Sequence, residues 1–570
     1  MPHIELPFPD IEWTPASHSG SCQTCAVLDP ELREQFDEFP HLMRYMHTMP
    51  VEEFGVPKYT AKLERGMGND EQPNYLYPVG NAVFAHVLYD AEDSRDWYVP
   101  IEPVILSNYD SLMEIVEELL LEAVHTFRQP TTPEEQREVL LNAMGKVVIV
   151  KGPGTISPPD GWKKPKGSNI TLGQVDADAV QYLLLRDKVG LGILDGMILD
   201  PNIEDVSCAG LGPVFIEHKV FDALKSTLVF DRHDDLDAFL RRTSERINKP
   251  VTYRKPIVDA TLPDGSRVNI VYGEEVSKRG SNFTIRKFTS TPLSVMDVVS
   301  GGACTYQMIA YLSIMIEEGM NLWVSGETAS GKTTLLNALT TFYPGGSKIV
   351  TVEDTPEVQV PHPNWIREVI RGAAGEAASV TMFDLLKAAL RQRPNAIIIG
   401  EIRGEEGNIA FQAMQTGHAV MATFHAATVE KLIQRVTAAP ISVPKSYIDN
   451  LNLVVIASAV KLPDGKLGRR IMSINELFGY DSVTDSFSFA EVFHWDPITD
   501  VHEFTGYMNS FLLENKVAPA RGIPANQRRR IYSEIDRRAK VLEKLHKGSG
   551  ISDFYELYKV LGNAKKQGLF

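Results

Sequence analysis

The chain has 570 residues, of which 43% are hydrophobic, 23% charged and 9% aromatic. That length corresponds to about three or four ordinary domains, and the composition excludes a chain that is disordered or collagen-like throughout. The 74 aspartates and glutamates outnumber the 57 lysines and arginines, which gives a net charge of −17 and argues against nucleic acid as the main ligand, because phosphate backbones are repelled.

The termini and apolar runs predict a cytoplasmic protein. No apolar run reaches the roughly 18 residues of a membrane-spanning helix. The N-terminal MPHIELPFPDIEW has neither the basic start nor the apolar core of a secretory signal. Four cysteines in the whole chain provide no disulfide framework, which fits a reducing compartment.

Residues 1–85 are rich in proline and aromatic residues without sustained periodicity, so we expect an irregular N-terminal extension of unassigned role. Cys22 and Cys25 form a CxxC there, with His18, His41 and His47 nearby. This spacing is compatible with zinc ligands. We favour two reduced thiols in a loosely ordered N-terminal region over a metal site, because nothing in the sequence fixes the remaining ligands.

Residues 86–195 predict a helical module. Leu112, Ile115, Leu119 and Ala123 keep helical spacing, a second helix opens at Pro133, and a third fits 176–189. Residues 196–289 predict an α+β domain, with β-rich segments at 213–218, 226–230 and 267–272, a helix at 234–247 and a Pro-Asp-Gly turn at 263–265.

Residues 290–495 alternate strands and helices as a parallel α/β sheet does. Apolar segments at 452–460 and 470–477 flank the turn at 463–465, which predicts a closing hairpin. Residues 496–570 predict a helical C-terminal extension whose Arg528, Arg529 and Arg530 form a basic run. Such a run is either a solvated face or a surface that docks a partner or a membrane.

A phosphate-binding loop carries the strongest functional signal. The apolar segment 321–325 runs into GETASGKT at 326–333, and a helical segment follows. This is GxxxxGK[ST] in its strand-loop-helix context, so we predict ATP or GTP binding. The nucleotide-binding positions are Gly326, Glu327, Thr328, Ala329, Ser330, Gly331, Lys332, Thr333 and Thr334. Lys332 would reach the β and γ phosphates, and Thr333 would ligate Mg²⁺.

Acids and histidines follow or flank three further apolar strands. Glu353 and Asp354 end the segment KIVTV, and Glu401 closes NAIIIG. Ligands bind at the carboxyl edge of such sheets, where an acid on a strand next to the P-loop strand can hold Mg²⁺ or orient water. His418 and His425 bracket the segment 419–424. We expect them to share the edge with the acids and at least one to contact the γ-phosphate.

Four ordered motifs resemble the secretion ATPase superfamily, the hexameric motors of type II and type IV secretion, type IV pilus assembly and the archaellum. They are the P-loop at 326–333, KIVTVEDTPE at 348–357, NAIIIGEIRGEE at 395–406 and TGHAVMATFHA at 416–426. DPNIEDVSCAGLGPVFIEHKVF at 200–221 resembles the N-terminal domain of the same family. The helical module and the C-terminal extension resemble the archaeal branch.

The resemblance implies a multidomain α/β protein, with a RecA-like P-loop motor domain after a PAS-like α+β domain and a helical module. It implies a catalytic Glu353, a Glu401 that positions Mg²⁺ and water, and a His425 that senses the γ-phosphate of ATP. Arginines of the N-terminal domain would complete the site across a subunit boundary, with Arg267 and Arg286 as candidates. Expected partners are further copies in a homo-hexamer, an inner-membrane platform protein and, indirectly, pilin-like subunits, with no nucleic acid.

Several departures from the family pattern bear on the function. The usual metal-binding Asp of Walker B is replaced by Gly-Glu, the histidine box reads HAA where many bacterial members have HTN, and the four-cysteine zinc insert is missing. The AIRNLI signature of retraction motors is also absent, which favours assembly or secretion over retraction. An archaellum motor, a nucleic-acid translocase and a nucleotide-dependent scaffold are the alternatives.

Overall fold

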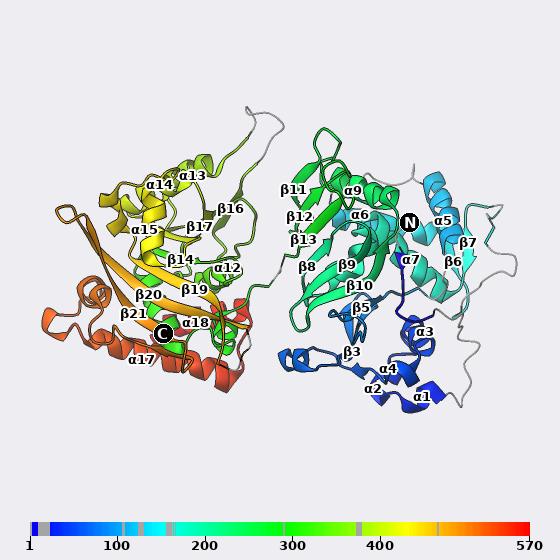
Figure 1. Ribbon diagram of the computed structural model, residues 1–570, viewed down its shortest axis with the longest axis horizontal. Coiled ribbons are helices and arrows are strands. Elements are labelled where there is room, and N and C mark those ends of the chain that lie inside the picture. Colours follow the sequence, from blue (N-terminus) through cyan, green and yellow to red (C-terminus); the bar gives the residue numbers. More distant parts are fainter. Residues whose placement is uncertain are drawn as a thin grey trace. The chain divides into compact units, whose positions relative to one another are not determined.

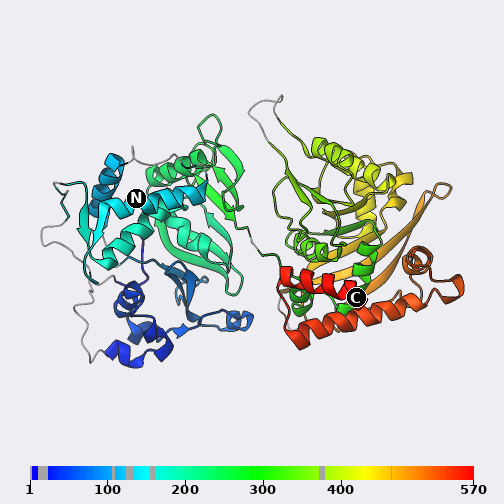
Figure 2. The same cartoon turned by 180° about the vertical axis from the view of Figure 1, so that it is seen from behind.

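The computed structural model describes the chain except residues 1–2, 10–22, 105–108, 124–129, 131, 155–161, 164, 166, 289–290, 372–378, 464 and 466, and the side chains of residues 65 and 133. It forms two compact units, Met1–Thr289 and Ser290–Phe570, drawn in Figures 1 and 2. Each unit has its own sheet and its own apolar cores, so the two are described separately.

The first unit is built on an eleven-stranded sheet with the order β11-β12-β13-β8-β9-β10-β5-β4-β3-β2, and β1 pairs with β10. The strands are β1 His3–Ile4, β2 Lys58–Tyr59, β3 Asn74–Gly80, β4 Val83–Leu88, β5 Trp97–Ile101, β8 Ile203–Cys208, β9 Gly212–His218, β10 Asp222–Phe230, β11 Ile257–Thr261, β12 Arg267–Val271 and β13 Asn282–Arg286. Helix α9 (His233–Arg246) packs its apolar residues into the core of this sheet.

The N-terminal segment differs from the irregular extension that the sequence predicts. It contains α1 (Gln23–Val27), α2 (Pro30–Glu34), α3 (Pro40–Thr48) and α4 (Val51–Phe54), followed by β2, β3 and β4. Apart from α3, these helices have five residues or fewer, which is too short to show a 3.6-residue period. Tertiary burial stabilises them instead, because Leu32, Leu42 and Met46 are fully buried in a cluster with residues of β3, β4 and β5.

A buried carboxylate joins the N-terminal strands to the rest of the sheet. Asp200 Oδ2 accepts hydrogen bonds from the hydroxyls of Tyr77 (2.7 Å) and Tyr98 (3.0 Å), and all three residues are almost completely inaccessible. Removal of either tyrosine hydroxyl would take a hydrogen bond from the buried Asp200 carboxylate and lower the free energy of unfolding by about 1–3 kcal/mol. The strands from residues 74–101 are therefore an integral part of the first unit.

The helical part of the first unit consists of α5 (Asp110–Ala123), α6 (Pro133–Val147) and α7 (Gln174–Lys188), with a small parallel sheet of β6 (Val148–Val150) and β7 (Ile170–Leu172). Leu112, Val116 and Leu119 of α5 meet Val180 and Leu184 of α7 in a separate apolar cluster. The short η4 (Gly192–Leu194) and α8 (Asp195–Leu199) lead into β8.

The second unit has a nine-stranded sheet with the order β16-β15-β17-β18-β14-β19-β20-β21-β22. The strands from β16 to β19 are parallel, and β20, β21 and β22 continue the sheet antiparallel. Their bounds are β14 Leu322–Gly326, β15 Ile349–Glu353, β16 Trp365–Val369, β17 Ala396–Ile402, β18 Ala419–Phe424, β19 Leu453–Lys461, β20 Leu467–Asp481, β21 Ser486–Asp496 and β22 Val501–Glu503. The predicted closing hairpin is present as β19 and β20.

Helices cover both faces of this sheet (Figure 1). One face carries α13 (Met382–Arg391), α14 (Glu406–Gln415) and α15 (Val429–Thr437). The other carries α10 (Val295–Ser300), α11 (Tyr306–Glu317), α12 (Lys332–Leu339) and the C-terminal helices. A mixed α/β architecture is thus confirmed. In the described part of the chain, no helix combines the length and apolarity needed to cross a bilayer.

The C-terminal residues share the core of the second unit. They form the short α16 (Ala518–Ala520), the long α17 (Arg530–Glu543) and α18 (Phe554–Lys566). Buried Glu476 of β20 accepts hydrogen bonds from the Tyr311 and Ser510 hydroxyls and from the Leu512 amide. Because a buried charge needs such partners, this carboxylate fixes the start of the C-terminal segment to α11 and the sheet.

Candidate functional site

The P-loop joins the centre of the second sheet to α12. Strand β14, between β18 and β19, ends at Gly326, and α12 begins at Lys332. A Cβ on Gly326 would lie 2.0 Å from the carbonyl oxygen of Ala457, and Gly331 has φ +86°. Both glycines are therefore required by close backbone approach and by the left-handed turn.

The side chain of Lys332 folds back onto the P-loop backbone. This side chain is almost buried, and Nζ donates a hydrogen bond of 2.5 Å to the Glu327 carbonyl, which also accepts from Ser330 Oγ at 2.7 Å. Burial lowers the pKa of Lys332, while the negative charge of Glu401 opposes that shift. The loop thus presents a cation, backbone amides and the α12 N-terminus at one point, which is the chemistry of a phosphate site.

Glu353, the last residue of β15, is completely buried. Its Oε1 accepts hydrogen bonds from the backbone amides of Glu357 (2.8 Å) and Val358 (2.6 Å). Burial nevertheless raises the pKa of Glu353 to about 7. A carboxyl group that titrates near neutrality is suited to accept a proton from water in one state and to release it in another.

Glu401, near the end of β17, contacts His425 after β18 and, through Arg403, is linked to Asp354 after β15. Its Oε1 lies 2.9 Å from His425 Nε2, and its Oε2 accepts a 2.5 Å hydrogen bond from Arg403 Nη2. Arg403 also donates from Nη1 to Asp354 Oδ2 at 3.1 Å. Burial lowers the pKa of His425, although the Glu401 charge opposes this. At neutral pH the imidazole is therefore neutral.

Two expectations about this edge require correction. His418 precedes β18 whereas His425 follows it, so His418 lies at the opposite edge of the sheet, where its Nδ1 contacts Thr416 Oγ1. Six extended residues carry the chain about 20 Å, which no imidazole can span. The strands that carry the acids are also not direct neighbours of β14, because β18 lies between β14 and β17.

The candidate arginines of the first unit are adjacent to each other. Arg267 of β12 and Arg286 of β13 are paired in register, and Arg267 makes a two-pronged ion pair with Asp259 through Nε (3.0 Å) and Nη2 (2.6 Å). Arg286 is exposed and lies opposite Asp205 of β8. Their participation in nucleotide chemistry stays a prediction.

Sequence reasoning missed two arginines near the P-loop and His425. Arg469 of β20 donates from Nε to the Ala329 carbonyl at 3.1 Å. Arg435 of α15 donates to the His425 carbonyl, and its guanidinium lies 5.1 Å from the centre of the Phe424 ring. Arg469 had no local sequence signal, because it reaches the P-loop from a strand far away in the chain. Arg435 is close to His425 in sequence, on the helix that follows β18, but a single arginine on a helix is not a signal of function.

The N-terminal cysteine motif is only partly described. Cys25 Sγ lies 3.4 Å from His47 Nε2, and His47 Nδ1 bonds the Met43 carbonyl. His41 instead bonds the Ala82 carbonyl, whereas Cys22 and His18 lie outside the described residues. Among the described residues no group of three metal-ligating side chains occurs, and zinc binding stays a prediction.

Comparison with known proteins identifies a family model and several relatives that match this chain. The family model described as "Type II/IV secretion system protein" matches residues 188–462. A protein of Methanocaldococcus jannaschii, described as uncharacterised, is 40% identical over 549 residues, which cover 95% of this chain and 98% of the relative. The type IV secretion system protein PtlH of Bordetella pertussis is 31% identical over 232 residues, which cover 36% of this chain and 67% of PtlH.

The chain belongs to the type II/IV secretion system protein family. Among solved structures of similar chains is the pilus retraction motor PilT with bound ADP, at 18% identity and a TM-score of 0.36, over 49% of this chain and 80% of PilT. That similarity is too weak to support any conclusion about function. The family model spans the P-loop, Glu353, Glu401 and His425 of this secretion-family chain.

Proposed function

We propose that this chain is a cytoplasmic ATPase that hydrolyses MgATP and converts the energy into mechanical work at a membrane-embedded filament or secretion machine. The observation that carries the proposal is the placement of Glu353, Glu401 and His425 at the carboxyl edge of the sheet that also holds the P-loop. A phosphate cradle alone would suit a nucleotide-dependent scaffold, whereas acids at the same edge supply the groups that hydrolysis requires.

The P-loop fits a triphosphate by its own geometry. Gly326 and Gly331 allow the backbone to curl, and Lys332 Nζ is close enough to the loop to exchange the Glu327 carbonyl for a phosphate oxygen. Thr333 in the first turn of α12 and the Glu401 carboxylate offer hard oxygen ligands, which Mg²⁺ prefers. Bound there, Mg²⁺ would neutralise negative charge on the phosphates.

We assign roles to the remaining groups as follows. Glu353 accepts a proton from the attacking water, Glu401 orders the metal shell, and His425 responds to the γ-phosphate through its contact with Glu401. Arg267 and Arg286 are proposed to complete the site of a neighbouring copy in a homo-hexamer, because an added arginine stabilises transition-state charge by orders of magnitude in rate. The unit from residue 290 onward would be the RecA-like motor, preceded by a PAS-like α+β domain.

The proposed work is assembly of a type IV pilus-like filament, or type II/IV secretion, through an inner-membrane platform protein that contacts pilin-like subunits. The name of PtlH, a type IV secretion system protein, supports this class, and the absent AIRNLI sequence disfavours retraction. An archaellum motor is the nearest alternative. A nucleic-acid translocase is disfavoured by the net charge of −17.

The direct experiment measures phosphate release by the purified full-length chain with MgATP. Lys332→Ala should abolish turnover, because backbone amides alone cannot neutralise the β and γ phosphates. Lys431→Ala, an exposed lysine of α15, is the matched control and should keep wild-type turnover. A wild-type chain that binds ATP without hydrolysing it would favour the scaffold. Equal turnover in Lys332→Ala would overturn the P-loop assignment.

A further inference from the structure

The C-terminal residues have a charge opposite to that of the whole protein. Residues 521–570 contain 12 lysines and arginines against 5 aspartates and glutamates, a net charge of +7, in a chain whose total is −17. Within it, helix α17 (Arg530–Glu543) has four cations and three acids, and Lys544 follows directly after its last residue. Local accumulation of one charge on a rigid element creates a field that selects partners of the opposite charge.

The exposed cations of α17, together with its C-cap residue Lys544, lie on one side of the helix. At about 100° per residue, Arg530, Arg537, Lys540 and Lys544 fall within an arc of about 80°. All four are exposed. Ile531, Ile535 and Leu542 lie on the other side and are buried in the core of the unit. The cationic row, about 21 Å long at 1.5 Å per residue, is therefore fixed to the fold.

The acids of the helix are already occupied. Glu534 accepts from Arg537 and Arg538, Asp536 accepts from Gln307, and Glu543 pairs with Lys547. Among the described residues, Arg530, Lys540 and Lys544 make no ion pair. Arg530 bonds only the amide oxygen of Gln527, at 2.7 Å. These three cations are available to an external anion.

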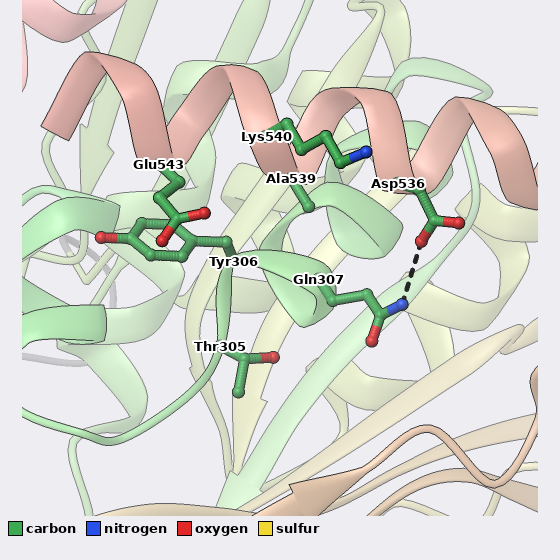
Figure 3. Close-up of a pocket in the computed structure, with 7 residues that line it drawn as sticks. All are labelled: Thr305, Tyr306, Gln307, Asp536, Ala539, Lys540 and Glu543. Carbon is green, nitrogen blue, oxygen red and sulfur yellow. Dashed lines mark hydrogen bonds between the residues drawn. The ribbon is translucent and has the colours of Figure 1, made fainter. Parts of the chain in front are cut away.

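Two hollows flank this row. One, of about 460 Å³, lies between α17 and the start of α11, and is lined by Thr305, Tyr306, Gln307, Asp536, Lys540 and Glu543. Figure 3 shows side chains of α17 directed over Tyr306 and Gln307. The other, of about 380 Å³, is lined by Arg521, Arg530, Ser533, Glu534 and Arg537, among others. In this second hollow the guanidinium groups of the three arginines outnumber the single carboxylate of Glu534.

We propose that this basic face of α17, defined as Arg530, Arg537, Lys540 and Lys544 with the two hollows, docks an acidic polypeptide segment of a partner protein. Carboxylates of the segment would pair with the unengaged cations, and its side chains would enter the hollows. A lipid bilayer fits less well, because the apolar side of α17 is buried against the core and cannot insert. The inference goes beyond nucleotide hydrolysis and does not depend on it.

The test measures binding to the full-length chain by fluorescence anisotropy. The probe is a labelled helical peptide of about 15 residues, long enough to match the cationic row, made of alanine with glutamate at every third or fourth position. The comparison probe has glutamine in place of every glutamate. We expect salt-sensitive binding of the glutamate peptide and no binding of the glutamine peptide, since exposed charge pairs are screened by ions.

Matched variants locate the site. Arg530→Glu with Lys544→Glu should weaken peptide binding roughly tenfold or more. Lys431→Glu with Lys461→Glu changes the net charge equally at exposed positions elsewhere in the unit and should change binding less than about twofold. Unchanged thermal midpoints show that both variants fold, and ATP hydrolysis measured in parallel separates failure here from failure of the proposed function.

Three outcomes would overturn the proposal. The first is no binding of the glutamate peptide to the wild-type chain. The second is equal loss in both double variants, which would indicate attraction to net charge alone. The third is binding to vesicles of phosphatidylglycerol and phosphatidylcholine that Arg530→Glu with Lys544→Glu abolishes while the peptide fails to compete, which would assign the face to a membrane.

Discussion

Arg367 Nε lies 3.6 Å from Glu353 Oε2, the carboxylate oxygen that the backbone amides leave unengaged. Arg367 belongs to β16, the edge strand paired in parallel with β15, and its guanidinium lies 5.3 Å from the centre of the Trp365 ring. Burial raises the pKa of Glu353, and Arg367 acts against that rise, whereas the nearby Glu357 charge adds to it. The arginine therefore helps to keep a buried carboxylate ionised.

Removal of this arginine should shift the pH dependence of hydrolysis. Glu353, with a pKa of about 7, acts as a base only when ionised, so activity should rise with pH through that region. Arg367→Gln should move the rise to higher pH by roughly one unit and lower activity at pH 7 by about fivefold. The measurement is kcat/KM for MgATP as a function of pH.

Two controls accompany the pH profile. Arg367→Lys keeps the charge and should restore much of the wild-type profile. Arg391→Gln, an exposed arginine at the end of α13, should leave the profile unchanged. An Arg367→Gln enzyme whose activity falls by the same factor at every pH would mean that the arginine supports structure and does not control the protonation of Glu353.

The same carboxyl group should make stability depend on pH. Its pKa is higher in the folded protein, about 7, than the ordinary value of 4.5. Its favourable contribution is therefore complete below about pH 4.5 and is lost as pH rises through 7. This rise in the pKa of Glu353 corresponds to a loss of about 3 kcal/mol in the free energy of unfolding at high pH. Glu353→Gln removes the titration, so its thermal midpoint relative to wild type should increase from pH 5 to pH 8. A difference that is constant with pH would contradict the assigned ionisation.

Mixed assemblies test whether two copies share one site. If Arg267 or Arg286 acts on a neighbouring copy, then chains with Arg267→Ala or Arg286→Ala, and chains with Lys332→Ala, each lack a different half of the site. Mixing them should restore hydrolysis to a fraction of the wild-type rate, with mass measurements reporting the ring. Unimpaired activity of both single arginine variants would reject these two candidates. Loss of activity without recovery on mixing would place the arginines in the site of their own chain.

The sequence was most informative where function depends on contiguous residues. The segments before the P-loop, before Glu353 and before Glu401 are apolar runs typical of buried parallel strands, and they form β14, β15 and β17. The P-loop glycines are specified by local backbone geometry. Their positions could therefore be predicted before any long-range contact was known.

What could not be predicted depends on strand order and on tertiary burial. Nothing local places β18 between β14 and β17, or brings Arg367 from β16 to Glu353. His418 precedes β18 and His425 follows it, so the two histidines lie at opposite edges of the sheet. Their similar distance from the strand in the sequence does not reveal this difference. The helices from 23–54 are stabilised by contacts with β3 to β5, and three of the four are too short to show a period in the sequence.

The two acids at the sheet edge should respond differently to magnesium. Glu353 is fully buried and bonded to backbone amides, whereas Glu401 is partly accessible and bridges Arg403 and His425. A general base must reach the attacking water, and a metal-shell acid must reach the cation, so one side chain rarely serves both. Glu353→Gln should therefore bind MgATP almost normally and hydrolyse it poorly at every Mg²⁺ concentration.

Glu401→Gln should instead raise the Mg²⁺ concentration required for hydrolysis, because a neutral amide attracts the hydrated cation less strongly than a carboxylate does. It also removes the negative charge that faces His425 and Arg403, so a lower maximal rate should accompany the shift. The measurement is hydrolysis at saturating ATP as Mg²⁺ is titrated, with Glu430→Gln, an exposed glutamate of α15, as the control. Rescue of Glu353→Gln by excess Mg²⁺, with Glu401→Gln inactive throughout, would show that the two roles are reversed.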